Sequence, residues 1–157
     1  MEENEKFVDG KTYIIDDEVR EIAEKVIKEK HIIIGPAKIK YVIVYPNIQK
    51  TIMGRCIRSS KTLKFFSDAD YIIEISGEVW DKLQDTTRKI LVEHELLHIL
   101  PIYNENKDKW SFKILDHDVQ DFYKIINENG ISWYEEMRTL AKSIYDLKPE
   151  DSERIRL

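Results

Sequence analysis

Hydrophobic and polar residues alternate most regularly in residues 38–45 and 71–76, and this period of two predicts β-strands. In the first segment, Ile39, Tyr41 and Ile43 share one face of the expected strand, while Lys40 and its alternate neighbours share the other. In the second segment, β-branched and aromatic residues dominate and Gly77 follows, which is typical of a strand that ends in a turn. These two strands are expected to form the centre of a small sheet.

Three further segments carry weaker strand patterns. Residues 52–58 and 62–66 are expected to be strands, with Ser59 and Ser60 forming the turn between them. Residues 110–114 are expected to be a short extended piece that follows a polar loop at residues 104–109.

Apolar residues recur at intervals of three and four elsewhere, which predicts helices. Asp16-Asp17-Glu18 opens a helix that runs to about Lys30, because acidic residues favour the positive end of the helix dipole. A helical turn is expected at residues 78–83 and a longer helix at about 86–100, with Asp85 or Thr86 as its N-cap and Pro101 as its stop. Two C-terminal helices are expected, at residues 117–127 with Asp116 as N-cap and at 132–147.

The order of these elements predicts one α+β domain over residues 1–157, with residues 1–9 flexible. It comprises an N-terminal helix, a small, mostly antiparallel sheet, the helix at 86–100 and the C-terminal helices. The net charge of −5 argues against nucleic acid as a general partner, and no apolar run is long enough to suggest a membrane span. The acidic N-terminal residues differ from a secretory signal, and the single Cys56 fits a reducing compartment, so we expect a cytoplasmic protein. The sequence carries no signal for an oligomeric state.

The segment His94-Glu95-Leu96-Leu97-His98 has the pattern H-E-x-x-H. On a helix, residues four apart lie on the same face, so both imidazoles can reach one Zn²⁺ ion. Glu95 lies beside the first histidine and is placed to act on the water at the metal. The alternative is a pair of histidines in the core, satisfied by hydrogen bonds.

A catalytic zinc takes three protein ligands and keeps one position for water. The sequence favours His117 as the third ligand, because the intervening chain is long enough for the metal helix to end, loop out and return. Asp116, Asp118 and Glu105 remain alternative ligands. Asp121, one turn after His117, could accept the free N–H of a ligand imidazole or could be an exposed carboxylate. His31 lies far upstream and is expected to be structural.

With zinc bound, Glu95 is expected to be the general base that takes a proton from the metal-activated water and passes it to the leaving amine. This chemistry is peptide-bond hydrolysis without a covalent intermediate, and its substrate is a protein or peptide. A donor that stabilises the oxyanion is also expected. The candidates are Tyr103, Tyr123, Tyr134 and Arg55.

The chain resembles the metallopeptidases encoded by bacteriophages and prophages, and more distantly the SprT-like proteases. The resemblance runs from about Lys38 to Phe122, and its main elements are the segment at residues 69–75, Trp80-Asp81, the H-E-L-L-H motif and the H-D-x-x-D-F motif that begins at His117. It implies a small zincin-like domain in which His94, His98 and His117 bind zinc and Glu95 is the base. It also implies that the strand at residues 71–76 lies at the sheet edge beside the cleft, where zincins pair an extended substrate.

Two other functions remain open. One is a non-catalytic module that binds a partner and carries zinc in a closed structural site, with Glu105 or Asp118 as a fourth ligand. Alternatively, a local basic cluster near two phenylalanines could bind nucleic acid, although such a cluster is more often a solvated surface. The cluster comprises Arg55, Arg58, Lys61 and Lys64. Cys56 lies between the two arginines and is expected to be a small core residue rather than a nucleophile.

Overall fold

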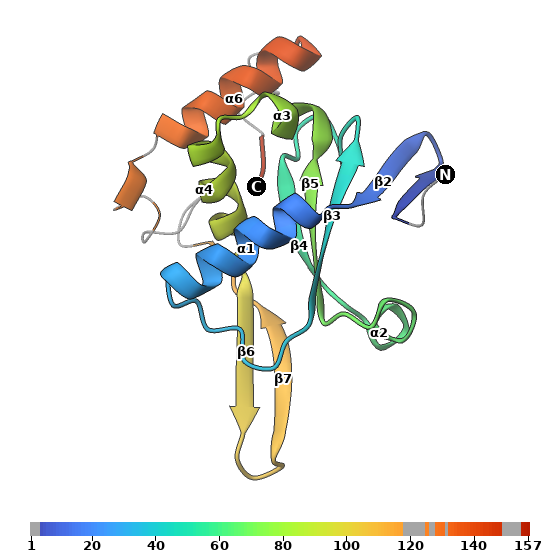
Figure 1. The fold of residues 1–157 in the computed structure, drawn as a ribbon, viewed down its shortest axis with the longest axis vertical. Coiled ribbons are helices and arrows are strands. Elements are labelled where there is room, and N and C mark those ends of the chain that lie inside the picture. The colour runs from blue at the N-terminus through green and yellow to red at the C-terminus, as the bar shows by residue number, and fades with distance from the viewer. Residues whose placement is uncertain (1–3, 118–124, 126–127, 131, 149–154) are drawn as a thin grey trace.

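The computed structural model describes residues 4–117, 125, 128–130, 132–148 and 155–157. Its centre is a mixed five-stranded sheet in the order β1-β2-β3-β5-β4, in which only the β3–β5 pair is parallel (Figure 1). The strands are β1 (Glu5–Val8), β2 (Lys11–Ile15), β3 (Ile39–Tyr45), β4 (Gly54–Arg58) and β5 (Tyr71–Ser76). The structure therefore confirms the α+β class and the mostly antiparallel sheet.

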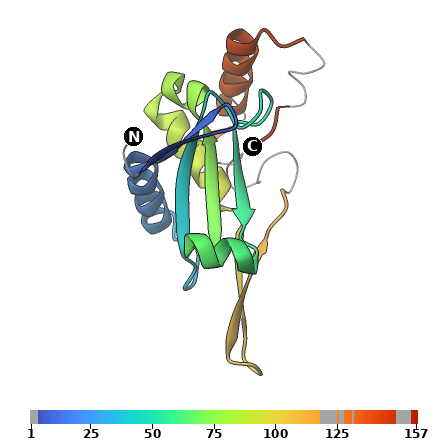
Figure 2. The same cartoon turned by 90° about the vertical axis from the view of Figure 1, so that its right-hand side faces the viewer.

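Helices α1 (Asp17–Glu29) and α4 (Asp85–Leu96) pack side by side against one face of the sheet (Figures 1 and 2). The apolar residues that α1 turns inward meet the inward residues of α4 and of the two central strands, and together they form the core. The fully buried members include Val19, Ala23, Val26, Ile73, Ile75, Leu91, Val92 and Leu96. Helix α3 (Gly77–Lys82) leads directly from β5 toward α4, and α6 (Ser132–Tyr145) packs on α3.

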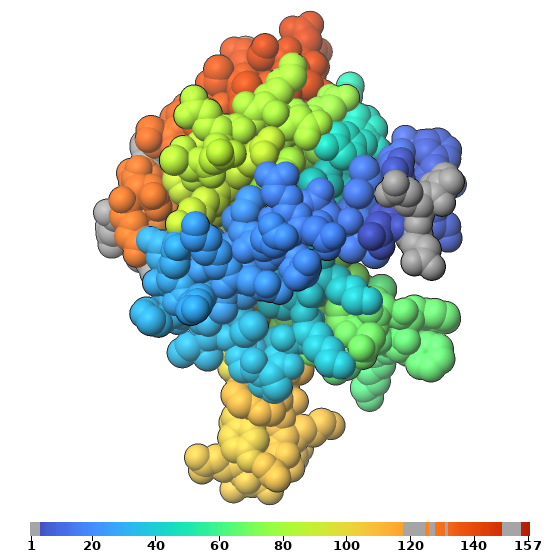
Figure 3. Space-filling view, viewed as in Figure 1, coloured from blue at the N-terminus to red at the C-terminus, as the bar shows by residue number. Residues whose placement is uncertain are grey.

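A two-stranded hairpin of β6 (Ile99–Asn104) and β7 (Lys109–Ile114) follows α4. It projects from the body of the molecule, which is also plain in the space-filling view (Figures 1 and 3). The outer part of the hairpin is exposed, whereas its base adjoins β4. The base of the hairpin therefore joins α4 to the segment that carries His117.

Several predicted elements are confirmed with close boundaries. The strands at 38–45 and 71–76 correspond to β3 and β5, and the extended piece at 110–114 corresponds to β7. Asp16 caps α1, since its Oδ1 accepts a hydrogen bond from the backbone N–H of Val19 at 2.8 Å. The helical turn at 78–83 and the helix at 132–147 correspond to α3 and α6.

The prediction of a strand at residues 62–66 is wrong, because these residues lie in helix α2 (Lys61–Ser67). Ser60 was expected in a turn, but its Oγ accepts a hydrogen bond from the backbone N–H of Leu63 at 3.0 Å and so caps the helix. The alternation of apolar residues was misleading, since Phe65 and Phe66 are about four-fifths exposed. The strand β1 also begins within the segment that was expected to be flexible.

Helix α4 is shorter than predicted. It begins at Asp85, with Gln84 rather than Asp85 or Thr86 as its N-cap, and it ends at Leu96 instead of Leu100. Pro101 does not stop the helix but lies within β6. The helix ends early because the carbonyl of His98 already accepts a hydrogen bond from the backbone N–H of Leu115, which continues the ladder of the hairpin.

The predicted edge position of strand 71–76 is also wrong. β5 lies between β3 and β4, and β4 forms the edge of the sheet. The predicted helix at residues 117–127 and its cap, together with Asp118, Asp121, Phe122 and Tyr123, fall almost entirely outside the described residues.

Candidate metal centre

Three histidines from different parts of the chain converge near the C-terminal end of α4. His94 is in α4, His98 lies just after α4, and His117 lies just after β7. One ring nitrogen from each lies within 4.8 Å of the others. His94 and His98 are buried and His117 is half-buried, so the cluster opens to solvent on the side of His117.

The last turn of α4 keeps the first two imidazoles on the same side. The backbone N–H of Leu97 donates to the carbonyl of Glu93 at 3.0 Å, and that of His98 donates to the carbonyl of Glu95 at 3.2 Å. This tighter i→i−3 bond ends the helix without turning His98 away. The ring centroids of His94 and His98 are 5.4 Å apart.

The hairpin brings His117 to this pair. Its register pairs Ile99 with Ile114, and the residues next to this pair at the base of the hairpin are His98 and Leu115. The backbone N–H of Leu115 donates to the carbonyl of His98 at 2.7 Å, which continues the ladder by one residue. His117 then follows two residues later, so the third imidazole is positioned by the hairpin rather than by a returning helix.

The same two residues fix the tautomer of His98. Its Nδ1 lies 2.7 Å from the carbonyl oxygen of Leu115. A carbonyl oxygen only accepts hydrogen bonds, so Nδ1 must carry the proton, and the lone pair of the imidazole is at Nε2. Imidazoles that bind metals are commonly oriented in this way by a backbone carbonyl.

The donor set fits a zinc ion. Zinc binds imidazole nitrogen at about 2.0–2.1 Å, which places tetrahedral donors roughly 3.4 Å apart. The Nε2 atoms of His94 and His117 are 2.8 Å apart, so the two rings need to separate by about half an ångström to share an ion. The indole ring of Trp133, from α6, packs near the His94 ring, with their centroids 5.7 Å apart.

Glu95 is fully buried and lies against β4. A Cβ atom on Gly54 would come within 3.1 Å of its Oε1, so the carboxylate occupies the space that a larger side chain at Gly54 would fill. Cys56 is near the same carboxylate, and burial, together with the negative charge of Glu95, raises the pKa of its thiol far above the usual range. A thiol held neutral in this way is a poor nucleophile, in agreement with the structural role expected for Cys56.

Comparison with known families agrees with this geometry. Residues 11–145 match the model of a family described as "Putative phage metallopeptidase". The chain belongs to this family. Neither the curated proteins nor the solved structures gave a match. No helix within the described ranges is long and apolar enough to cross a membrane.

Two of the alternative ligands that were considered from the sequence lie apart from the histidine cluster. Glu105 is exposed in the turn of the hairpin, and Asp116 is exposed beside His117, and neither belongs to the group of converging ligand atoms. His31 is also exposed and has a positive φ of 53°, outside the cluster.

The candidates for an oxyanion donor also have other partners. Arg55 Nε donates to Oε1 of the buried Glu74 at 2.5 Å. Tyr134 donates to the carbonyl of Ile155 at 3.0 Å, and Tyr103, on the hairpin, donates to Asp108. Reasoning from the sequence missed Gly54, which is the residue that makes room for Glu95. Only its place on the edge strand shows its importance.

Proposed function

We propose that this protein is a zinc metallopeptidase in which His94, His98 and His117 bind the metal and Glu95 is the general base. The observation that carries the proposal is the convergence of three imidazole nitrogens, one of them with its tautomer set by Leu115, next to a buried carboxylate. Membership of a metallopeptidase family supports the same reaction class. The three-histidine set leaves a coordination position for water, as catalytic zinc sites do.

A bound zinc ion would polarise the scissile carbonyl and lower the pKa of a coordinated water. Glu95 supplies the proton transfer: its carboxylate takes a proton from the attacking water and gives it to the nitrogen of the leaving amine. The walls around Glu95 exclude bulk water, so the carboxylate needs little reorganisation when charge develops nearby. Gly54 keeps this carboxylate in place by leaving it room.

The edge of β4 is the proposed platform for the substrate backbone. One side of β4 pairs with β5, and the other side pairs with no strand among the described residues. Just before β4, the edge already holds an extended segment of the chain: the N–H of Met53 donates to the carbonyl of Arg156 at 2.8 Å, and the N–H of Arg156 donates to the carbonyl of Thr51 at 2.6 Å. A peptide that continues this pairing along β4 would pass beside Glu95.

The proposal is tested by metal-dependent cleavage. The purified protein is stripped with a chelator, reloaded with one equivalent of zinc and incubated with a complex peptide mixture, and new peptide termini are identified by mass spectrometry. We expect new termini only with the zinc-loaded protein, and we expect them to disappear when the chelator is present. A protein that binds zinc tightly but produces no new termini from any peptide would instead indicate a structural zinc site.

A further inference from the structure

A pocket of about 300 Å³ lies at the end of β4 that is remote from Glu95. It is formed where the end of β4 and the start of α2 face β7. Its walls combine cationic side chains, one carboxylate and two aromatic rings. The residues that matter here are Arg58, Lys61, Lys64, Asp70, Trp110 and Phe112.

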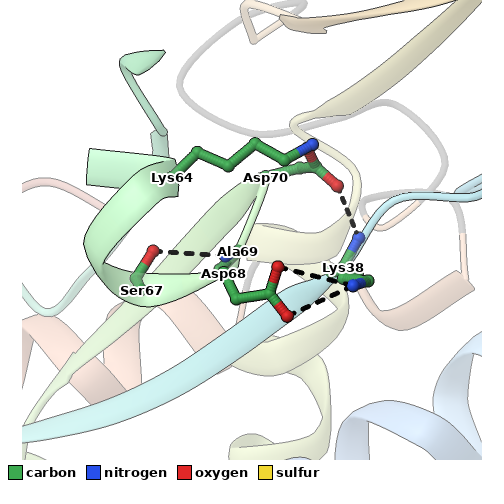
Figure 4. Close-up of polar contacts among 6 residues, drawn as sticks. All are labelled: Lys38, Lys64, Ser67, Asp68, Ala69 and Asp70. Carbon is green, nitrogen blue, oxygen red and sulfur yellow. Dashed lines mark hydrogen bonds and ion pairs between the residues drawn. The ribbon is translucent and has the colours of Figure 1, made fainter. Parts of the chain in front are cut away.

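The charges in this pocket are unbalanced. Asp70 is buried, and its two oxygens accept hydrogen bonds from the backbone N–H of Lys38 at 2.9 Å and from Lys64 Nζ at 2.5 Å (Figure 4). The charge of Lys64 is therefore matched within the protein. Arg58 and Lys61 are exposed and form no ion pair with any acidic side chain in the described part of the chain. The guanidinium of Arg58 donates only a long bond, 3.4 Å, to the carbonyl of Phe112.

The pocket lies on the path that the proposed function gives to the substrate. β4 runs from Gly54, beside Glu95, to Arg58, which is about 13 Å for four residues of extended chain. At the other end, the segment 155–157 already occupies the edge next to residues 51–53. An extended peptide that reaches Glu95 along this edge therefore continues toward Arg58 and the pocket.

We propose that this pocket binds an acidic side chain of the peptide substrate, about four residues from the bond that is cleaved. The proposal rests on the proposed peptidase function, because it takes the β4 edge as the substrate platform. Arg58 offers a planar, forked donor that suits a carboxylate, and Lys61 adds a second positive charge. Trp110 and Phe112 provide an apolar wall for the methylene groups of a glutamate side chain.

The first test compares cleavage preferences. The zinc-loaded wild type and an Arg58→Gln/Lys61→Gln double variant act on the same peptide mixture, and acidic residues are counted at each position on both sides of every cleaved bond. We expect the wild type to show an enrichment of Asp and Glu about four residues from the bond, and the double variant to lose it while still cleaving. Lys28→Gln, which removes an exposed charge on α1, is the matched control and should keep the enrichment.

The second test measures binding without cleavage. Two dye-labelled, end-blocked peptides that differ only by Glu or Gln are titrated with the zinc-loaded Glu95→Gln variant, and fluorescence anisotropy is recorded. A charged pair of this kind should give about tenfold tighter binding of the Glu peptide, or about 1.4 kcal/mol. Adding Arg58→Gln and Lys61→Gln should reduce the ratio to about one, since the charge complementarity is then lost.

The outcomes separate the two proposals. Cleavage by the wild type with no acidic preference and no Glu-over-Gln binding would overturn the pocket and leave the peptidase intact. Absence of cleavage together with a Glu preference that depends on Arg58 and Lys61 would overturn the peptidase and leave the pocket as an acidic-peptide site. Equal binding of both peptides, combined with Arg58-dependent binding of a single-stranded oligonucleotide, would assign the pocket to nucleic acid and overturn the proposal.

Discussion

Gly54 on the edge strand β4 and Glu95 on α4 lie close together: a Cβ at Gly54 would lie 3.1 Å from Oε1 of Glu95. This distance is below ordinary van der Waals contact, so a side chain at Gly54 must displace the carboxylate or the strand. Helix α4 and strand β4 pack against each other at this point, so a Cβ at residue 54 requires the carboxylate of Glu95 to shift by a few tenths of an ångström. The position of the proposed base therefore depends on a residue that carries no chemistry.

Substitution of Gly54 should reduce catalysis without removing the metal. We expect Gly54→Ala to lower the rate of peptide cleavage by about tenfold and Gly54→Val to lower it further, because small displacements of a catalytic group are costly. Zinc content should stay at the wild-type level. Ile57→Val, on the same strand, is the control for a general disturbance of β4. Full activity in Gly54→Val would show that Glu95 does not need its present position.

The backbone of Leu115 should control zinc affinity. Leu115→Pro removes the N–H that donates to the carbonyl of His98, which loosens the base of the hairpin and the approach of His117. We expect zinc affinity, measured by competition with a chromogenic chelator, to fall by about 10–100-fold. Leu115→Ala keeps the N–H and should bind zinc nearly as the wild type does. Equal losses in both variants would mean that the side chain, and not the ladder, matters.

The thiol of Cys56 should be unreactive in the folded protein. Burial, and then the charge of Glu95, raises its pKa above the usual value, so the thiolate, which is the reactive form, is scarce between pH 7 and 9. We expect slow reaction with a disulfide reagent at pH 8 and rapid reaction after unfolding in guanidinium chloride. Cys56→Ala should retain peptide cleavage. Rapid labelling of the native protein would contradict the raised pKa of this thiol.

The hydroxyl of Tyr71 should stabilise the base of the hairpin. It donates to the carbonyl of Lys113 at 2.7 Å, and burial raises its pKa to about 12, so it stays protonated throughout the neutral range. Tyr71→Phe should lower the free energy of unfolding by about 1 kcal/mol, measured by denaturant titration. Because the folded pKa is raised, ionisation of Tyr71 in the unfolded state at about pH 10 and above adds a further loss of stability in the wild type that Tyr71→Phe lacks. An unchanged free energy at neutral pH would show that this hydrogen bond adds nothing to stability.

Sequence patterns predict best the helices and strands that depend on residues close together in the chain. The alternation around Ile39–Tyr45 and the acidic run Asp16-Asp17-Glu18 predict β3 and the start of α1 nearly to the residue, since both depend on neighbouring side chains. The H-E-x-x-H spacing brought His94 and His98 together for the same reason. The strand prediction for residues 62–66 is wrong because Ser60 caps a helix whose aromatic residues face outward. The alternation of residue types does not reveal this exposure.

The long-range features were harder to predict. His117 was favoured as a ligand, but the hairpin that carries it depends on pairing between residues far apart in the sequence, such as Ile99 and Ile114. β4, and not β5, forms the edge of the sheet, because β5 follows β4 in the sequence and lies between β3 and β4, parallel to the first and antiparallel to the second. The role of Gly54 in making room for Glu95 follows only from this arrangement, since a single glycine at the start of a strand has many possible causes.

The central claim is that Glu95 is the base of a zinc site held by three histidines, and one comparison tests it most directly. Zinc content and the rate of peptide cleavage are measured together for the wild type, Glu95→Gln and Glu105→Gln, the last being a control at an exposed glutamate on the hairpin. We predict one zinc per chain in all three proteins, wild-type cleavage in Glu105→Gln, and a loss of at least about 100-fold in Glu95→Gln, within the range for removing a general base. Cleavage by Glu95→Gln at the wild-type rate, with its zinc in place, would contradict the account.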